Sequence, residues 1–71
     1  RLDVNLFPNP ASKTLNVEGD FERIEIFNLI GELVISTSSS NIDVSSLESG
    51  IYYSHILKDQ DILIKQITIT K

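Results

Sequence analysis

The sequence contains no cysteine, tryptophan or methionine, and only one histidine and three glycines among its 71 residues. Without cysteine, neither a disulfide framework nor a thiolate metal site can stabilise the fold, although this absence does not fix the compartment. The glycines stand far apart, which excludes a glycine-rich phosphate-binding loop. No apolar run approaches the roughly 18 residues needed to cross a bilayer, so we expect no membrane insertion.

The chain is short and acidic. A single domain of this size buries only about 60% of the surface that its unfolded chain exposes, which leaves little room for a deep catalytic pocket. Ten Asp and Glu residues against six Lys and Arg give a net charge of −4, which repels phosphate groups and argues against nucleic acid and anionic lipid as partners. The chain begins at Arg1 with no signal-peptide pattern, so we expect a piece cut from a longer protein.

Apolar residues alternate with polar ones along most of the chain, and helical periodicity is nearly absent. The alternation predicts seven strands, centred on the pairs Val4 and Leu6, Leu15 and Val17, Ile24 and Ile26, Leu33 and Ile35, Ile42 and Val44, Tyr52 and Ile56, and Ile67 and Ile69. Turn-forming residues separate these strands at 8–10, 18–20, 28–31, 38–41, 45–50 and 58–61. This spacing predicts a small all-β antiparallel sandwich.

The same alternation assigns side chains to faces. In the segment "ERIEIFN", Ile24 and Ile26 are expected to point inward and Phe27 outward. The last strand is ambiguous, because its first apolar residues fall on both faces. We expect Leu63, Ile67 and Ile69 in the core, reconciled by a bulge near Lys65 and Gln66 or by an apolar outer face at the start of the strand.

Residues that could carry catalysis are few and scattered. His55, the only histidine, lies on a strand without converging ligands, so a solvated strand histidine is favoured over a metal ligand or a general base. A hydrolase hypothesis would rest only on His55, Ser54 and scattered carboxylates, since no nucleophile motif is present. The acidic turn at Glu18 and Asp20 lacks the ligand spacing of a calcium loop. We predict a noncatalytic domain without cofactor or metal.

The segment "LESGIYY" is more informative. Gly50 permits a positive φ, and Tyr52 then opens a strand with its ring directed into the core. Sandwich domains use a tyrosine at such a corner, where its hydroxyl bonds to upstream backbone. Leu47, Gly50 and Tyr52 are therefore expected to fasten one corner of the sandwich, whatever its function.

Four ordered blocks, "LFPNPA", "IEIFNLIGELV", "IDVSSLESGIYYSHI" and "KQITITK", together resemble one family. This is the C-terminal sorting domain, type A, of proteins exported by the type IX secretion system (also called the Por secretion system) of Bacteroidota. The resemblance covers essentially the whole chain and keeps the motifs in the family's order. A lone Pro-x-Pro is weak support, whereas four ordered blocks ending on a lysine are much more specific.

Twelve positions match the family's motifs and are the candidate sorting residues: Phe7, Pro8, Asn9 and Pro10 in the Tyr/Phe-Pro-Asn-Pro block; Gly31, Leu33 and Val34 in the Gly-x-Leu-Val block; Leu47, Gly50 and Tyr52 in the Leu-x-x-Gly-x-Tyr block; Lys65 and Lys71 in the basic C-terminal end. One departure is Glu32, where the family usually has lysine or glutamine. Any role of a basic group at that position is in doubt for this chain.

The resemblance implies a seven-stranded Ig-like sandwich, spanning residues 1–71, at the C-terminus of a larger secreted protein. The covalently linked N-terminal cargo would enter the periplasm by its own signal peptide. The outer-membrane type IX translocon would then recognise the folded domain, and a sortase-like peptidase would often cut upstream of it. The implied destination of the cargo is the cell surface or the medium.

Recognition by a translocon requires exposed groups that are held rigidly. Phe7 and Asn9 each precede a proline and are therefore restricted to extended backbone, which gives the chain a nearly fixed path out of the first strand. Lys71 would offer a cationic group at the end of the last strand. An alternative function is a carbohydrate-binding or adhesion module, supported by an outward aromatic pair, Phe27 and Tyr53.

Overall fold

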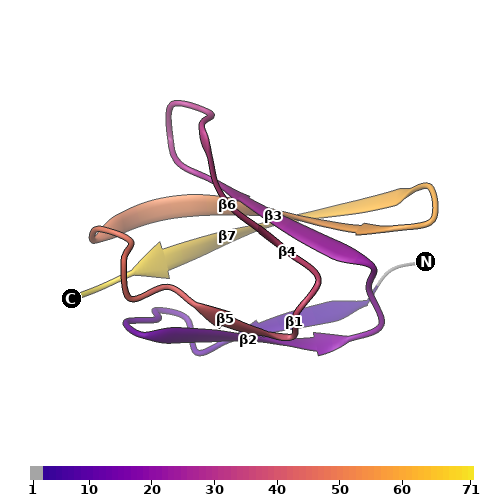
Figure 1. Cartoon of the computed structure of the whole chain (residues 1–71), viewed down its shortest axis with the longest axis horizontal. Coiled ribbons are helices and arrows are strands. Elements are labelled where there is room, and N and C mark those ends of the chain that lie inside the picture. The colour runs from indigo at the N-terminus through magenta and orange to yellow at the C-terminus, as the bar shows by residue number, and fades with distance from the viewer. Residues whose placement is uncertain (1–2) are drawn as a thin grey trace.

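The computed structural model describes residues 3–71, so Arg1, on which the expectation of a cut chain rests, lies outside them. Within this range it contains seven strands in two antiparallel sheets and no helix, which confirms the predicted all-β sandwich (Figure 1). The first sheet has the order β1-β2-β5, with β1 (Val4–Phe7), β2 (Thr14–Gly19) and β5 (Asn41–Asp43). The second has the order β4-β3-β6-β7, with β3 (Arg23–Phe27), β4 (Leu33–Thr37), β6 (Gly50–Lys58) and β7 (Asp61–Ile69).

The core lies between the two sheets and is built mainly of branched aliphatic side chains. Its members come from both sheets, because the inward position of each strand recurs at every second residue. The buried hydrophobic residues are Val4, Ala11, Leu15, Val17, Ile24, Ile26, Ile42, Val44, Tyr52, Ile56, Ile67 and Ile69.

The structure shows which apolar residues of β7 face the core. Its pairing with β6 runs from Asp61 to Ile69 without a register shift, so no bulge is present. Ile67 and Ile69 are buried and Leu63 is half-buried against the core, as expected. Ile62 and Ile64 instead point outward and are 61% and 58% exposed. The outer face at the start of β7 is therefore apolar.

Strand β3 also has the predicted faces, but its partner β4 differs from simple alternation. Ile24 and Ile26 are fully buried, whereas Phe27 is half-buried on the outer face. The register between β3 and β4 shifts between Ile26 and Phe27, so Ile26 pairs with Ile35 while Phe27 pairs with Leu33. Leu33 therefore does not share the inner face with Ile35 and is 51% exposed.

Two turns are shorter than their sequences suggested. The β6–β7 hairpin turns at residues 59–60 alone, because Lys58 already pairs with Asp61. Strand β2 extends through Gly19, which pairs with Val4 of β1. A Cβ at Gly19 would lie 2.6 Å from the carbonyl oxygen of Asp3, and its φ is +130°, so only glycine allows β1 to approach this closely.

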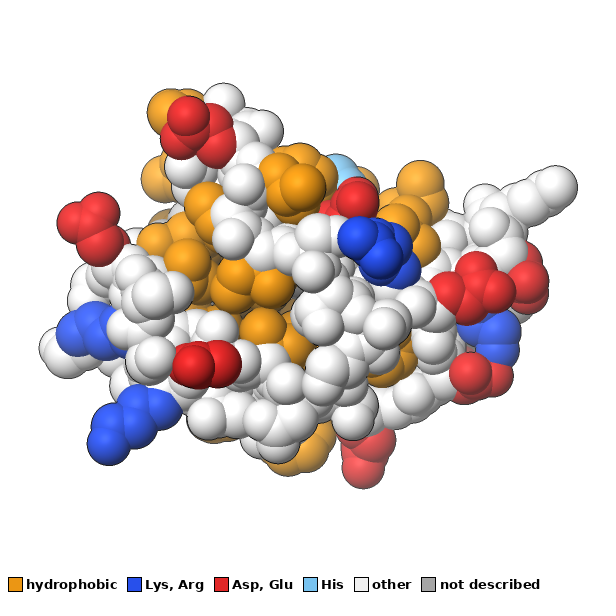
Figure 2. Space-filling view, viewed as in Figure 1, with side chains coloured by type: hydrophobic (Ala, Val, Ile, Leu, Met, Phe, Trp, Pro, Cys, Tyr) orange, Lys and Arg blue, Asp and Glu red, His pale blue; other side chains and the backbone are white. Residues whose placement is uncertain are grey.

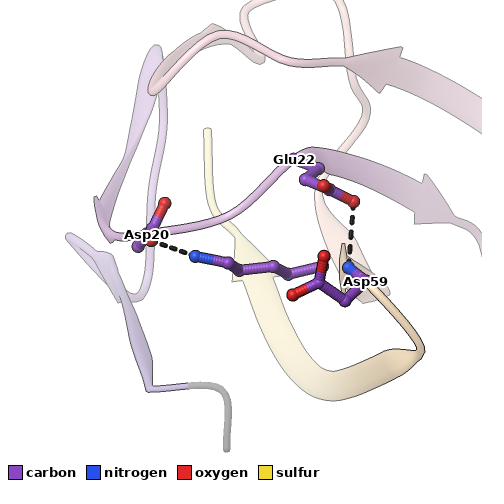
Figure 3. A network of polar contacts seen from close by, with 4 residues as sticks. Asp20, Glu22 and Asp59 are labelled. Atoms are coloured by element: carbon purple, nitrogen blue, oxygen red, sulfur yellow. Dashed lines mark hydrogen bonds and ion pairs between the residues drawn. The ribbon is translucent and has the colours of Figure 1, made fainter.

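The β6–β7 hairpin is tied to the β2–β3 connection by a polar network (Figure 3). The Lys58 ammonium donates to the Asp20 carboxylate, and the Asp59 backbone N–H donates to Glu22 Oε1 at 2.9 Å. The hydrogen bond to Asp20, reinforced by the nearby acidic charges, raises the pKa of Lys58. This network closes the end of the sandwich at which the β6–β7 hairpin turns.

No helix in residues 3–71 has the length and apolar character needed to cross a membrane.

We expect Ile67→Ala to destabilise the domain far more than Ile64→Ala, although both isoleucines lie on β7. Ile67 is 1% exposed, so truncation leaves a cavity and lowers the free energy of unfolding by about 3 kcal/mol. Ile64 is 58% exposed, and its truncation is expected to cost about 1 kcal/mol or less. Urea unfolding of both variants measures the difference, and equal losses would contradict this arrangement of the core.

Candidate functional site

Three of the four motif blocks meet at one end of the sandwich, opposite the β6–β7 hairpin (Figure 1). We call this region the motif end and define it as residues 7–12, 44–52 and 68–71. It contains the Pro-Asn-Pro block, the glycine-tyrosine corner and the C-terminal lysine. Hydrogen bonds between these three segments hold the region together.

The Pro-Asn-Pro block lies exposed along the edge of β7. Pro8 and Pro10 have no N–H groups, and the peptide bond before each proline is cis. Between them, the side-chain amide of Asn9 bonds to backbone groups of β7, as the backbone of a neighbouring strand would. Its Oδ1 accepts from the Thr68 N–H at 3.0 Å, and its Nδ2 donates to the Gln66 carbonyl at 3.3 Å.

Ala11 continues this pairing with its own backbone. Its N–H donates to the Thr68 carbonyl and its carbonyl accepts from the Thr70 N–H, both at 2.9 Å, in a parallel bridge to β7. The Ala11 methyl group is 1% exposed and belongs to the core. Periodicity could not reveal this residue, because it stands alone in a turn. The chain therefore crosses from the first sheet to the second at residues 8–11.

The glycine-tyrosine corner has the predicted geometry. The Tyr52 hydroxyl donates to the Glu48 carbonyl at 2.8 Å, while its ring is buried in the core. Gly50 has a φ of +156°, and Leu47 is half-buried against the core. The sequence therefore predicted this corner correctly from its tyrosine and glycine alone.

Lys71 joins the other two segments of the motif end. Its ammonium donates to the carbonyls of Ser12 at 2.6 Å, Ser45 at 3.0 Å and Val44 at 3.2 Å. Its backbone N–H also donates to the Ser49 hydroxyl at 3.0 Å. An ammonium has three donors, so this one is fully used inside the domain. Lys71 thus acts as an internal tie, which differs from the freely offered cation expected from the sequence.

Asp43 lies beside this tie. Its Oδ1 accepts from the Ser45 hydroxyl at 2.6 Å and from the Ser45 N–H at 2.9 Å. These two hydrogen bonds, with a smaller contribution from the Lys71 charge, lower the pKa of Asp43. The charged form of this carboxylate therefore stabilises the loop whose carbonyls hold Lys71.

The Gly-x-Leu-Val block lies on the loop that projects between β3 and β4. Asn28 Oδ1 accepts from the N–H groups of Ile30 and Glu32, and Asn28 Nδ2 donates to Glu32 Oε1 at 2.9 Å. Gly31 has a φ of +88°, which suits glycine at this turn. Glu32, the departure from the family pattern, therefore holds its own loop. Leu33, and beside it Val34, lie exposed on β4.

An open hollow of about 310 Å³ separates this loop from the glycine-tyrosine corner. Asn28, Leu29 and Ile30 line one side, and residues 48–52 line the other. Figure 2 shows hydrophobic side chains gathered below the projecting loop. Lys65, the other residue of the basic C-terminal block, lies outside both the motif end and this loop. It lies further back along β7, where its carbonyl accepts from the Ser54 hydroxyl at 2.9 Å.

The residues considered for catalysis are not brought together. Ser54 is fully buried, whereas the neighbouring His55 lies on the outer face and contacts the Phe27 ring at 4.6 Å between centroids. Because adjacent strand residues point to opposite faces, they cannot form a nucleophile–base pair. Within residues 3–71, no group of three or more His, Asp or Glu side chains is close enough to hold a metal ion.

We expect Tyr52→Phe to lower the free energy of unfolding by about 1 kcal/mol, because it removes the hydroxyl bonded to the Glu48 carbonyl and keeps the buried ring. Tyr53→Phe is the matched control, since Tyr53 lies next in the strand on the exposed face. We expect the free energy of unfolding of Tyr53→Phe to stay within about 0.5 kcal/mol of that of the unmodified domain. Urea unfolding compares the two, and a larger loss in the control would contradict the corner.

We expect Asp43→Asn to destabilise the domain near neutral pH but much less in acid. A carboxyl whose pKa is lowered by folding adds stability above its unfolded pKa of about 3.9, and this stability is lost as the pH falls through the lower folded pKa. The stabilities of the two proteins should therefore converge as the pH falls through the lowered pKa of folded Asp43. Thermal unfolding of both proteins between about pH 2 and pH 6 tests this. A difference in unfolding temperature that grows in acid would contradict a lowered pKa for Asp43.

The chain matches the model of a known protein family. The family model described as the secretion system C-terminal sorting domain matches residues 5–70, which is nearly the whole chain. No curated protein sequence matches the chain significantly. The matched range includes all four motif blocks except the final Lys71. The chain therefore belongs to the family of secretion system C-terminal sorting domains, which mark proteins of the type IX secretion system for export across the outer membrane.

Proposed function

We propose that the type IX translocon recognises this domain at the motif end, through Phe7 and the Pro-Asn-Pro segment, and that the domain is attached to the C-terminus of its cargo. The observation that carries this proposal is the convergence of three separate motif blocks on one end of the sandwich. The side chains of this segment are also exposed, which a purely structural role would not require. Phe7 is 47% exposed, and both prolines and Asn9 lie at the surface.

The motif end divides into holding groups and presenting groups. Asn9, Tyr52 and Lys71 make internal hydrogen bonds and position the segment. Phe7, Pro8 and Pro10 offer apolar surface to a partner. Hydrogen bonds already hold the Pro-Asn-Pro segment in place. Its conformational entropy therefore falls little when a partner binds, which favours recognition. We therefore assign contact to the exposed ring and prolines, and positioning to the other three.

In this proposal the domain acts as a noncatalytic address. The cargo precedes residue 1, and a sortase-like peptidase cuts upstream of the sandwich after export. The exposed groups that we assign to recognition carry no nucleophile or general base. At the same surface, the Lys71 ammonium donates to backbone carbonyls of its own domain. We therefore assign recognition to apolar contact and backbone hydrogen bonding.

The domain can be tested behind a periplasmic signal peptide and a fluorescent reporter in a type IX-competent bacterium. We expect the reporter to reach the cell surface or the medium in cells with the translocon and to stay in the periplasm of cells that lack it. Periplasmic retention of the intact fusion in both strains would contradict a sorting function for this chain.

The recognition surface is tested by Phe7→Ala in the same fusion. We expect export to fall at least tenfold while the thermal unfolding of the purified domain changes little, because the ring is exposed. Ile62→Ala is the matched control, since Ile62 is similarly exposed but lies near the β6–β7 hairpin, and its export should remain normal. Normal export of Phe7→Ala would refute recognition at the motif end without affecting the sorting function itself.

A further inference from the structure

Strand β7 leaves one half of its outer edge open. Along the other half, the backbone groups of Gln66, Thr68 and Thr70 face outward and bond to Asn9 and Ala11. Backbone groups alternate in direction along a strand, and the β6–β7 register has no shift, so those of Ile62 and Ile64 face the same edge. Within residues 3–71, no hydrogen bond reaches these two positions from that side.

The open half of the edge is also apolar. Ile62 and Ile64 are 61% and 58% exposed, on the outer face of the four-stranded sheet. An exposed edge strand that combines unpaired backbone with aliphatic side chains is a template for a further strand. Edge strands are usually protected by lysine or proline. Proline protects only the half of this edge beside Pro8 and Pro10, and the open half contains a single lysine, Lys65.

The sequence of this half, "DILIK", is complementary to itself when two copies run antiparallel. A two-fold axis at Leu63 places Ile62 of each copy opposite Ile64 of the other. Both residues direct their backbone toward the edge, so the two pairs would make four backbone hydrogen bonds. The same register places Asp61 of each copy opposite Lys65 of the other, where opposite charges attract, while Asp61 keeps its interaction within its own chain.

We propose that the occupant of this edge is a second copy of the chain, and that two domains join through β7 into one continuous eight-stranded sheet. The edge-facing backbone of Ile62 and Ile64 provides the hydrogen bonds, and the four isoleucine side chains pack in cross-strand pairs. Lys65, which lies outside the motif end, selects the register through Asp61 of the other copy. The contact is independent of the sorting function, because it uses the opposite half of β7.

Only a short stretch of strand is buried, so the dimer is weak and forms at high local concentration. Sedimentation velocity of the purified 71-residue chain, from roughly 10 µM to roughly 1 mM, is expected to show the average mass rising from monomer toward dimer. In the dimer, the amide protons of Ile62 and Ile64 should exchange at least tenfold more slowly than in dilute monomer. A mass that stays monomeric throughout, or unchanged exchange at these amides in a dimer, would overturn the proposal.

Two variants locate the contact. Ile62→Lys/Ile64→Lys places lysines opposite lysines at the edge and should abolish dimerisation, while far-ultraviolet circular dichroism checks that the sandwich remains folded. The matched control is Leu29→Lys/Ile30→Lys, which changes two aliphatic residues of similar or greater exposure on the β3–β4 loop. The control should dimerise like the unmodified chain, and loss of the dimer in the control alone would overturn the edge contact.

The register has its own test. Lys65→Asp brings two carboxylates together in each charge pair and should weaken the dimer several-fold. The double variant Asp61→Lys/Lys65→Asp restores opposite charges in the same register and should recover most of the affinity. Failure of the double variant to recover beyond the single variant would overturn the two-fold register at Leu63.

Discussion

The four hydrogen bonds that Asn9 and Ala11 make with β7 and the adjoining Thr70 are the contact on which the arrangement of the two sheets depends. They occur where the chain leaves the first sheet and reaches the edge of the second. Because Ala11 also places its methyl group in the core, the same residue joins the sheets by backbone and by packing. The last strand is therefore fixed by a segment nearly sixty residues earlier in the chain.

A domain without disulfides must restrain its loops by weaker contacts, and this one uses a lysine at each end. Lys71 closes the motif end through three backbone carbonyls, and Lys58 closes the hairpin end through Asp20. An exposed ion pair contributes little by itself. At both ends the ammonium makes charge-assisted hydrogen bonds, to three carbonyls at the motif end and to a carboxylate at the hairpin end.

The hydrogen bonds and exposure of the motif end divide the motif residues into two groups. Tyr52 and Lys71 are needed to hold the motif end, so their presence in a sorting motif does not imply contact with a partner. Phe7 and the two prolines have no comparable internal requirement for exposure. The motif therefore contains both residues that make internal hydrogen bonds and residues whose side chains are exposed, and the structure separates the two kinds.

The sequence by itself determined the fold class and most of the core. Alternation located seven strands, and the tyrosine corner followed from Leu47, Gly50 and Tyr52, because these features depend on local backbone geometry. It also carried the family motifs, whose order is visible without a structure.

Only the tertiary structure decided which side chains are satisfied internally. Local patterns could not show that the Lys71 ammonium donates to three distant carbonyls, that Ala11 is buried, or that β7 has an apolar outer face instead of a bulge. Each of these facts depends on contacts between segments far apart in the chain. Such contacts arise from the packing of the two sheets, and no local periodicity encodes them.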